Sequence, residues 1–248
     1  AVADFTVNAP SSTAQTLGPV TGQAGTVTSA GTLTVAGGTV AVTISGNNAT
    51  LTNNGTISQT GKSRVIRDNT GVTGLTVTNA AGAVMQAADA DVIQMNKSPA
   101  SVVLNNYGTM SSLNASKGGA QAVDFNAIIS GSNVINNFSS GILQAIDADA
   151  VRPGVNGVVN NYGLIKATNT TDTGDDGIDA QTNTGVSVHN FSTGTIEAAR
   201  HGITGGNITG SGAYAMSIAN DVGGMIKGND GSGINIDGIN KNELVTIN

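Results

Sequence analysis

The heptapeptide Val159-Asn160-Asn161-Tyr162-Gly163-Leu164-Ile165 contains the unit from which the chain is built. It reads Φ-x-Asn-x-Gly-x-Φ, where Φ is an apolar residue, and a variable insert and a Gly-Ile-Asp step at 177–179 follow it. The skeleton recurs with its asparagine at Asn53, Asn79, Asn106, Asn137, Asn161, Asn190 and Asn220. A weaker copy has Ser29 in the asparagine position. Seven intervals separate Ser29 from Asn220, so the period averages about 27 residues, which is typical of a solenoid.

Each unit contains three short runs in which apolar and polar residues alternate. One run ends at the asparagine, one at the glycine and the apolar residue after it, and one at the small-Φ-polar step. Alternation with a period of two indicates a β-strand rather than a helix. Three short strands per turn, repeated in register, predict an all-β parallel β-helix of about eight coils with nearly no helix.

The chain is therefore predicted to be one elongated domain, although 248 residues would allow two by length alone. Residues 1–24 lack the repeat and are predicted to form an N-terminal cap over the first coil. Residues 25–248 are predicted to be β-helix repeats. We expect these repeats to continue beyond residue 248, because 245–248 reads as the first strand of another coil.

The recurring asparagine and glycine are explained by tight corners between strands. Asparagine tolerates left-handed backbone angles, and its amide can donate to and accept from the asparagine one coil away. The seven asparagines are therefore predicted to form a buried ladder. The glycines that follow them are predicted to adopt positive φ. In the Asn79 unit the glycine position is assigned to Gly82 and the next apolar position to Val84.

The composition argues against several classes of function. The net charge is −6 and the chain has only 10 Lys and Arg, whereas nucleic-acid binding needs clustered cations. There is no cysteine, so disulfides and thiolate metal sites are excluded. No run of 18 apolar residues is present, so this segment is not expected to insert into a membrane as a helix. No cofactor is predicted.

The units resemble the repeats of passenger domains from Gram-negative autotransporters, which are type V secreted proteins. The resemblance rests on Asn-Asn-Tyr-Gly-Leu-Ile at 160–165 and Asn-Asn-Gly-Thr-Ile at 53–57, followed by a variable loop and a step such as Gly-Ile-Asp at 177–179. The opening segments at 4–7 and 31–37 are also similar to the start of such passengers.

This resemblance implies a right-handed β-helical stalk displayed on the surface of a Gram-negative bacterium. It further implies a C-terminal β-barrel translocator in the full-length protein and a role in adhesion or cell–cell aggregation. The expected partners are a host surface glycan or protein, or another passenger. Because aromatic residues are only 3% of the chain, weak multivalent contact along the column is predicted rather than tight binding of a small apolar ligand.

Some passengers of this kind are serine proteases or lipases, and such an enzyme would need a nucleophile motif. Neither Gly-Asp-Ser-Gly nor Gly-x-Ser-x-Gly occurs, and the two histidines, His189 and His201, are predicted to face solvent. An enzyme is therefore not predicted. The alternative is a polysaccharide lyase or hydrolase, because β-helix enzymes of that kind place paired aspartates on parallel strands of adjacent turns.

Aligning the small-Φ-polar steps of successive units gives two files of side chains. The file that precedes the step contains Arg64, Asp91, Gln121, Asp149, Asp176, His201 and Ser232. The file that follows it contains Arg67, Gln94, Asp124, Arg152, Asp179, Thr204 and Asn235. In the second file Asp124, Arg152 and Asp179 alternate in sign. They are predicted to form a salt-bridged ladder on an exposed face.

Asp149 and Asp176 are neighbours of like sign in the first file. With Asp147 and Asp175 they are the candidates for a carboxylate pair or a cation site, and the alternative is a solvated ridge. No metal site is predicted beyond these candidates. The acidic loop at 171–176 is particular to this unit, and a function local to this coil is expected there.

Overall fold

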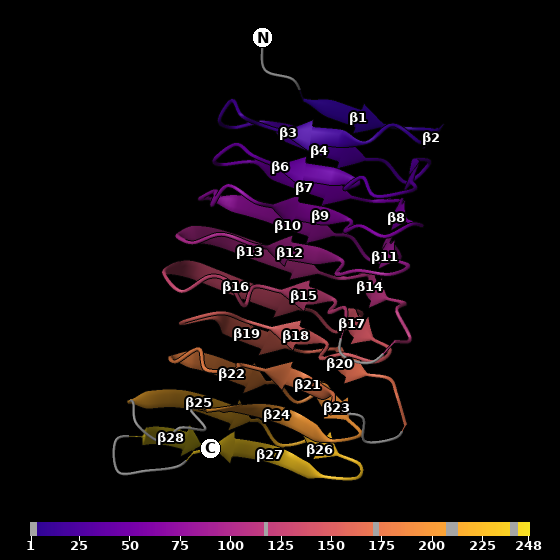
Figure 1. Ribbon diagram of the computed structural model, residues 1–248. Helices are drawn as coiled ribbons and strands as arrows, with labels where there is room; N and C mark the ends of the chain where they lie inside the picture. Colours follow the sequence, from indigo (N-terminus) through magenta and orange to yellow (C-terminus); the bar gives the residue numbers. More distant parts are fainter. Residues whose placement is uncertain (1–3, 117–118, 171–173, 207–212, 239–242) are drawn as a thin grey trace.

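The computed structural model describes residues 4–116, 119–170, 174–206, 213–238 and 243–248. In this part of the chain all regular structure is β, in 28 short strands, and no helix long and apolar enough to span a membrane is present. The strands lie in three parallel sheets that wind around one axis, with successive turns stacked in a column (Figure 1). The prediction of an all-β parallel β-helix is confirmed.

Consecutive strands belong to different sheets, and every third strand returns to the same sheet. Sheet A contains β1 (Phe5–Val7), β4 (Ala24–Val27), β7 (Thr50–Asn53), β10 (Leu75–Asn79), β13 (Ala100–Asn106), β16 (Gly131–Asn137), β19 (Val158–Asn161), β22 (Val186–Asn190), β25 (Tyr214–Asn220) and β28 (Glu243–Ile247). Sheet B contains β2 (Pro10–Ser11), β5 (Thr32–Val35), β8 (Thr56–Gln59), β11 (Val84–Ala87), β14 (Thr109–Ser112), β17 (Ile142–Ala145), β20 (Leu164–Ala167), β23 (Thr195–Ala198) and β26 (Met225–Gly228). Sheet C contains β3 (Gln15–Leu17), β6 (Val42–Ile44), β9 (Ile66–Asp68), β12 (Ile93–Met95), β15 (Val123–Asp124), β18 (Val151–Arg152), β21 (Asp176–Asp179), β24 (His201–Gly206) and β27 (Ser232–Asp237).

The segment at 1–24, for which a cap is predicted, forms a coil of its own in its described residues. Its strands β1, β2 and β3 pair in parallel with β4, β5 and β6. Phe5 lies opposite Gly25, and a Cβ on Gly25 would be 2.3 Å from the Phe5 ring. The ring thus occupies the space that a larger side chain fills in other coils. The segment covers the next coil by continuing the three sheets.

The core is a thin column of stacked aliphatic side chains. Alternate residues of each strand point inward, so equivalent residues of successive coils lie above one another. Sheet A contributes a file of Leu51, Val77, Leu104, Ile135, Val159, Val188 and Ile218. Sheet C contributes Ile66, Ile93, Val123, Val151, Ile178 and Ile203. All are buried, and each contributes about 1.5–3 kcal/mol relative to an exposed position.

The strand register corrects two positions of the sequence alignment. Val27, not Ser29, lies opposite Asn53. Met85 lies opposite Ile57 and is buried, so Val84 is not the core residue of its unit. Both errors arose because the repeats were aligned on a small residue, Ser29 in one unit and Gly82 in the other. The strand register is instead set by the apolar side chains that must point into the core.

The seven repeat asparagines form a continuous hydrogen-bonded ladder at the corner where sheet A ends. Each Nδ2 donates to the Oδ1 of the next asparagine over 2.8–3.0 Å, in the order Asn53, Asn79, Asn106, Asn137, Asn161, Asn190 and Asn220. The described non-glycine residues with positive φ are Asn48, Asn156 and Gln181. The expectation of left-handed backbone angles at the ladder is therefore wrong. Asparagine is explained there by amide pairing and by the hydrogen bonds that each amide donates to backbone carbonyls of the corner, such as those of Asn137 to Gly141 and Leu164.

The glycines after the ladder are also needed for a different reason than predicted. Gly163 does not have positive φ, but a Cβ on it would lie 2.3 Å from the carbonyl oxygens of Phe138 and Gly141 in the preceding coil. Gly55 is crowded in the same way by the coil before it. Glycine is favoured at this position because two coils approach closely, although Ala83 occupies it in the Asn79 unit. Gly82, whose φ is +77°, lies one residue before the equivalent position.

Candidate functional site

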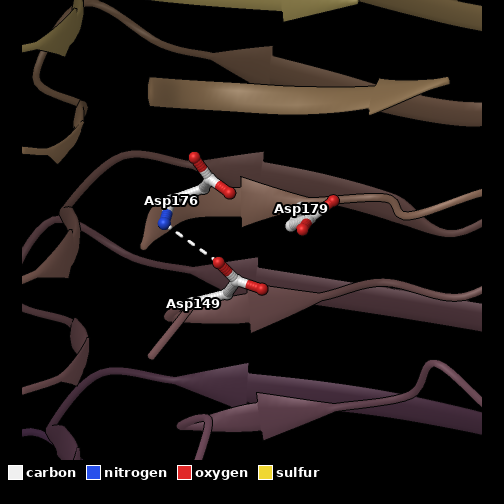
Figure 2. A group of neighbouring side chains, drawn as sticks. All are labelled: Asp149, Asp176 and Asp179. Atoms are coloured by element: carbon white, nitrogen blue, oxygen red, sulfur yellow. Dashed lines mark hydrogen bonds between the residues drawn. The ribbon is translucent and has the colours of Figure 1, made fainter. Parts of the chain in front are cut away.

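The outer face of sheet C collects the aspartates of the two predicted files. The register places Asp124 beside Arg152, and the pairing of Val151 with Ile178 extends both files to the next coil. Asp149, Asp176 and Asp179 approach one another there, each with a carboxylate oxygen within 4.8 Å of the others (Figure 2). All three are buried, and Asp149 accepts the backbone N–H of Asp176 over 2.9 Å.

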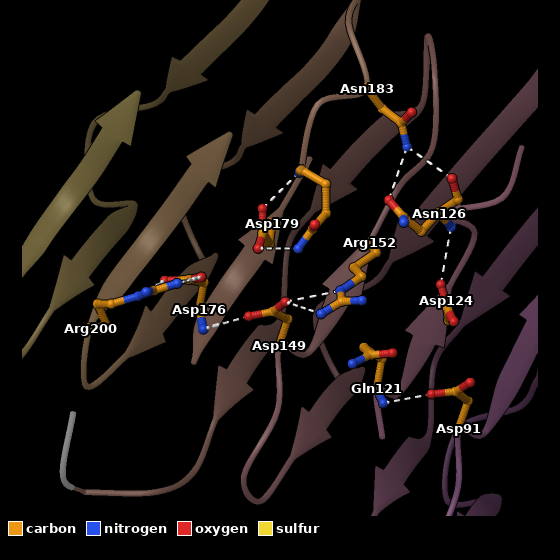
Figure 3. A network of polar contacts seen from close by, with 11 residues as sticks. Asp91, Gln121, Asp124, Asn126, Asp149, Arg152, Asp176, Asp179, Asn183 and Arg200 are labelled. Carbon is orange, nitrogen blue, oxygen red and sulfur yellow. Dashed lines mark hydrogen bonds and ion pairs between the residues drawn. The ribbon is translucent and has the colours of Figure 1, made fainter. Parts of the chain in front are cut away.

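Two arginines neutralise two of these carboxylates (Figure 3). Arg200 donates from Nε and Nη2 to the two oxygens of Asp176, over 3.1 and 2.7 Å. Arg152 donates from Nε and Nη2 to one oxygen of Asp149, over 3.0 and 2.9 Å. Asp179 accepts hydrogen bonds only from uncharged groups, the backbone N–H and the side-chain amide of Gln181. The cluster therefore has one more carboxylate than guanidinium groups.

The predicted charge ladder of Asp124, Arg152 and Asp179 is corrected in two respects. The three residues are neighbours in one file, but the ion pair of Arg152 is with Asp149 in its own coil. Asp179 is only 7% exposed, so the face is not the solvated surface that was predicted. A sequence alignment of strands does not show this burial.

The cation-site candidates are corrected as well. Asp147 and Asp175 are buried but lie outside the group of converging carboxylates, whereas Asp179, which was not a candidate, belongs to it. The positive charge that a cation would bring to Asp149 and Asp176 is already supplied by their arginines. We assign no metal site to this cluster. Residues 171–173 of the acidic loop lie outside the described part of the chain.

Burial raises the proton affinity of these carboxylates. It raises the pKa of Asp179 to about 7, with the nearby Asp149 charge adding to the effect. It raises the pKa of Asp149 to about 6 although Arg152 acts in the opposite direction. The pKa of Asp176 is also raised by burial, against the hydrogen bonds of Arg200. With one uncompensated negative charge, the cluster binds a proton near neutral pH.

A shallow cleft lies beside the cluster but does not reach the predicted catalytic pair. Its volume is about 170 Å³, and it is lined by Asp179, Gln181, Thr182, Arg200, Thr204, Gly205, Gly206 and Asp237. Asp149 and Asp176 do not line it. A polysaccharide would have to displace two arginines to reach them. The geometry therefore does not favour the alternative of glycan cleavage by Asp149 and Asp176.

A second feature, an aromatic ladder, runs along the corner between sheets A and B. Tyr107, Phe138, Tyr162 and Phe191 each follow a ladder asparagine. Their rings stack almost in parallel, with centroid separations of 4.1, 6.1 and 3.9 Å in that order. The His189 ring stacks on Phe191 at 3.7 Å, and its Nε2 lies 2.8 Å from Asp221 Oδ1. Tyr107 is 37% exposed and the other three rings are partly exposed, so the edge of the ladder can be reached from outside.

These rings form one edge of a regular array on the outer face of sheet A. We call it the lateral array, and it consists of the outward residues of four successive coils: Val103, Asn105 and Tyr107; Val134, Asn136 and Phe138; Val158, Asn160 and Tyr162; Ser187, His189 and Phe191. Asn136 and Asn160 donate to the preceding asparagine over 3.0 Å. The array contains no Asp, Glu, Lys or Arg. Apart from His189, which is paired with Asp221, the array has no acidic or basic residue, although the chain has a net charge of −6.

The low aromatic content of the chain did not predict this array, because a content of 3% suggested too few rings to form a surface. Four of the seven aromatic residues of the chain belong to it. The signal was present as the short motif Val-Φ-Asn-Asn followed by Tyr or Phe at 103–107, 134–138 and 158–162. Because the repeat stacks equivalent residues, a motif that recurs in successive units must become a continuous column.

Comparison with protein-family models, curated proteins and solved structures finds no match. The three stacked parallel sheets define the chain as a parallel β-helix with a repeat architecture. Its functional assignment rests on its own surfaces.

Proposed function

We propose that this chain is the β-helical stalk of a surface-displayed, autotransporter-type passenger that mediates adhesion or cell–cell aggregation by lateral contact. The observation that carries the proposal is the lateral array, a surface without Asp, Glu, Lys or Arg that extends over four coils. The localisation that we propose is the surface of a Gram-negative bacterium, reached through the translocator of the full-length protein.

The charge distribution favours contact through the lateral array. Two copies of net charge −6 repel each other, and this repulsion is smallest where neither surface carries charge. The neighbouring outer face of sheet B does carry charge, for example in the Lys166–Glu197–Lys227 network. A second copy would therefore approach most easily along the lateral array.

The spacing of the array also suits a partner with the same repeat. Stacked strands are about 4.8 Å apart, so each row of one copy can face a row of another over several coils. Each row contributes little, but contacts repeated along a rigid column add up to avidity. Self-association between passengers is therefore the first partner we propose, and a host surface glycan or protein is the second.

The test is a variant in which Tyr107, Phe138, Tyr162 and Phe191 are all replaced by Ser. Sedimentation velocity of the wild-type chain is expected to show oligomers that grow with concentration, and the variant should remain monomeric. A matched control replaces Gln86 and Gln144, outward residues of sheet B, by Ser and should associate like the wild type. Far-UV circular dichroism checks that each variant is folded.

Three results would refute the proposal. One is a wild-type chain that stays monomeric at high concentration and binds neither glycans nor cells. Another is a control variant that loses association as fully as the aromatic variant does. The third is full-length protein that is not accessible to protease on intact cells.

A further inference from the structure

Sheet C has its shortest strands at the carboxylate cluster. β15 and β18 have two residues each, and β18 is in register with β21 through the single pair Val151 and Ile178. β24 and β27, by contrast, pair through five residues. Backbone pairing therefore contributes less to the stacking of β18 on β21 than to the stacking of β24 on β27.

Side chains supply additional links between the coils at this place. Asp149, held by Arg152 in the β18 coil, accepts the N–H of Asp176 in the β21 coil. Asp176 in turn binds Arg200, which precedes β24. Three successive coils are thus connected by one chain of polar contacts (Figure 3). We call these residues, together with Asp179, the sheet C clamp.

The clamp has an imbalance of charge that depends on protonation. Its three carboxylates converge in a buried position, while only two guanidinium groups neutralise them. Further charged or titratable groups act on it electrostatically or lie next to it: Asp124 of β15, Asp147, Asp175, His201 of β24, Tyr214 of β25 and Asp237 of β27. Most of these groups are acidic, so they add to the repulsion within the clamp.

We infer that the sheet C clamp is a pH-sensitive device: a proton held among its carboxylates ties β18, β21 and β24 together, and loss of this proton loosens these coils selectively. When the proton leaves, three negative charges remain within 4.8 Å of one another in a buried site. Removing them from water then costs more than the two arginines restore. The inference is independent of the proposed adhesive function.

The direction of the effect follows from the pKa shift. The pKa of Asp179 is raised to about 7 in the folded chain, above its value of about 3.9 in an unfolded one. The stabilisation that the bound proton provides is therefore complete below about pH 4 and is lost as the pH rises through about 7. Between pH 5.5 and 7.5, the equilibrium constant for local opening should increase about 20-fold for one such proton.

The experiment is hydrogen exchange of the 248-residue chain at pH 5.5 and 7.5, corrected for intrinsic exchange rates. Peptides within 145–167 and 176–206 should lose protection about 20-fold on going to the higher pH. Peptides within 24–44, which cover β4 to β6 and contain no titratable side chain, are the internal reference and should change by less than about 3-fold. A loss of protection that is equal in both regions would overturn the inference.

The variant Asp179→Asn identifies the group that titrates. Asparagine keeps an oxygen for the backbone N–H of Gln181, loses the second acceptor that Gln181 Nε2 uses, and carries no charge. The change in protection between pH 5.5 and 7.5 should therefore fall from about 20-fold to about 4-fold or less, which is the part that Asp149 can supply. The exposed control Asp230→Asn should keep the 20-fold change. Persistence of the full pH effect in Asp179→Asn would refute the assignment. If that variant does not fold, the comparison of peptides in the wild-type chain still decides.

Discussion

Replacing Asn137 by Ala tests whether the asparagine ladder stabilises the column. Asn137 is fully buried, accepts from Asn106, and donates to Asn161, Gly141 and Leu164. The substitution removes two ladder hydrogen bonds at about 1 kcal/mol each, and the unpaired amide groups and the cavity add to this. We expect the free energy of unfolding to fall by about 3 kcal/mol.

The matched control is Asn220→Ala at the end of the same ladder. Asn220 accepts from Asn190 and donates to Gly224, but its side chain is exposed, so water can replace the lost partners. Its loss should cost about 1 kcal/mol. Urea unfolding followed by far-UV circular dichroism measures both values, provided that the slopes agree. Equal costs for the two variants, or a cost below about 1 kcal/mol for Asn137→Ala, would refute the reasoning.

Three further predictions concern the glycine positions and the charged face. Gly163→Ala should destabilise the folded chain by about 3 kcal/mol in thermal unfolding, because the added Cβ would meet two carbonyl oxygens at 2.3 Å. The control Gly38→Ala should be neutral, because a Cβ there would have no neighbouring atom within 4 Å. Arg200→Gln should cost about 3 kcal/mol in urea unfolding at pH 8, because Asp176 would be buried without its guanidinium partner, and a neutral result would contradict the assigned ion pair. Burial raises the pKa of Asp91 to about 7, so Asp91→Asn should be more stable than the wild type at pH 8 and lose this advantage at pH 4, as measured by urea midpoints.

The sequence predicted the architecture because the repeat and the alternation are local patterns. The three alternating runs in each unit predicted three strands per coil, and the asparagine period predicted the stacking of seven asparagines. The same patterns aligned the files that contain Asp149 and Asp176, and the strand register agrees with that alignment. The patterns failed at Ser29 and Gly82, where a small residue resembled the repeat but the core set a different register.

The candidate site could be predicted only in part. The sequence brought Asp149 and Asp176 together, but it assigned Arg152 to neighbours in its file and did not include Asp179 with them. The partner of Arg152 depends on the direction of its side chain, and the fold directs it to Asp149. The lateral array could have been predicted from the motif that ends in Tyr or Phe, since equivalent positions of a solenoid must lie in contact.

The sequence by itself therefore determined the period, the strand alternation and the identity of the stacked residues. It could do so because equivalent positions of successive repeats stack directly on one another. Only the tertiary structure decided which aspartates are buried, which arginine neutralises which carboxylate, and where the excess negative charge remains. Those properties depend on side-chain direction and on cover by neighbouring coils. Residues about 27 positions apart become neighbours at about 4.8 Å, and the balance of charge is set at that distance.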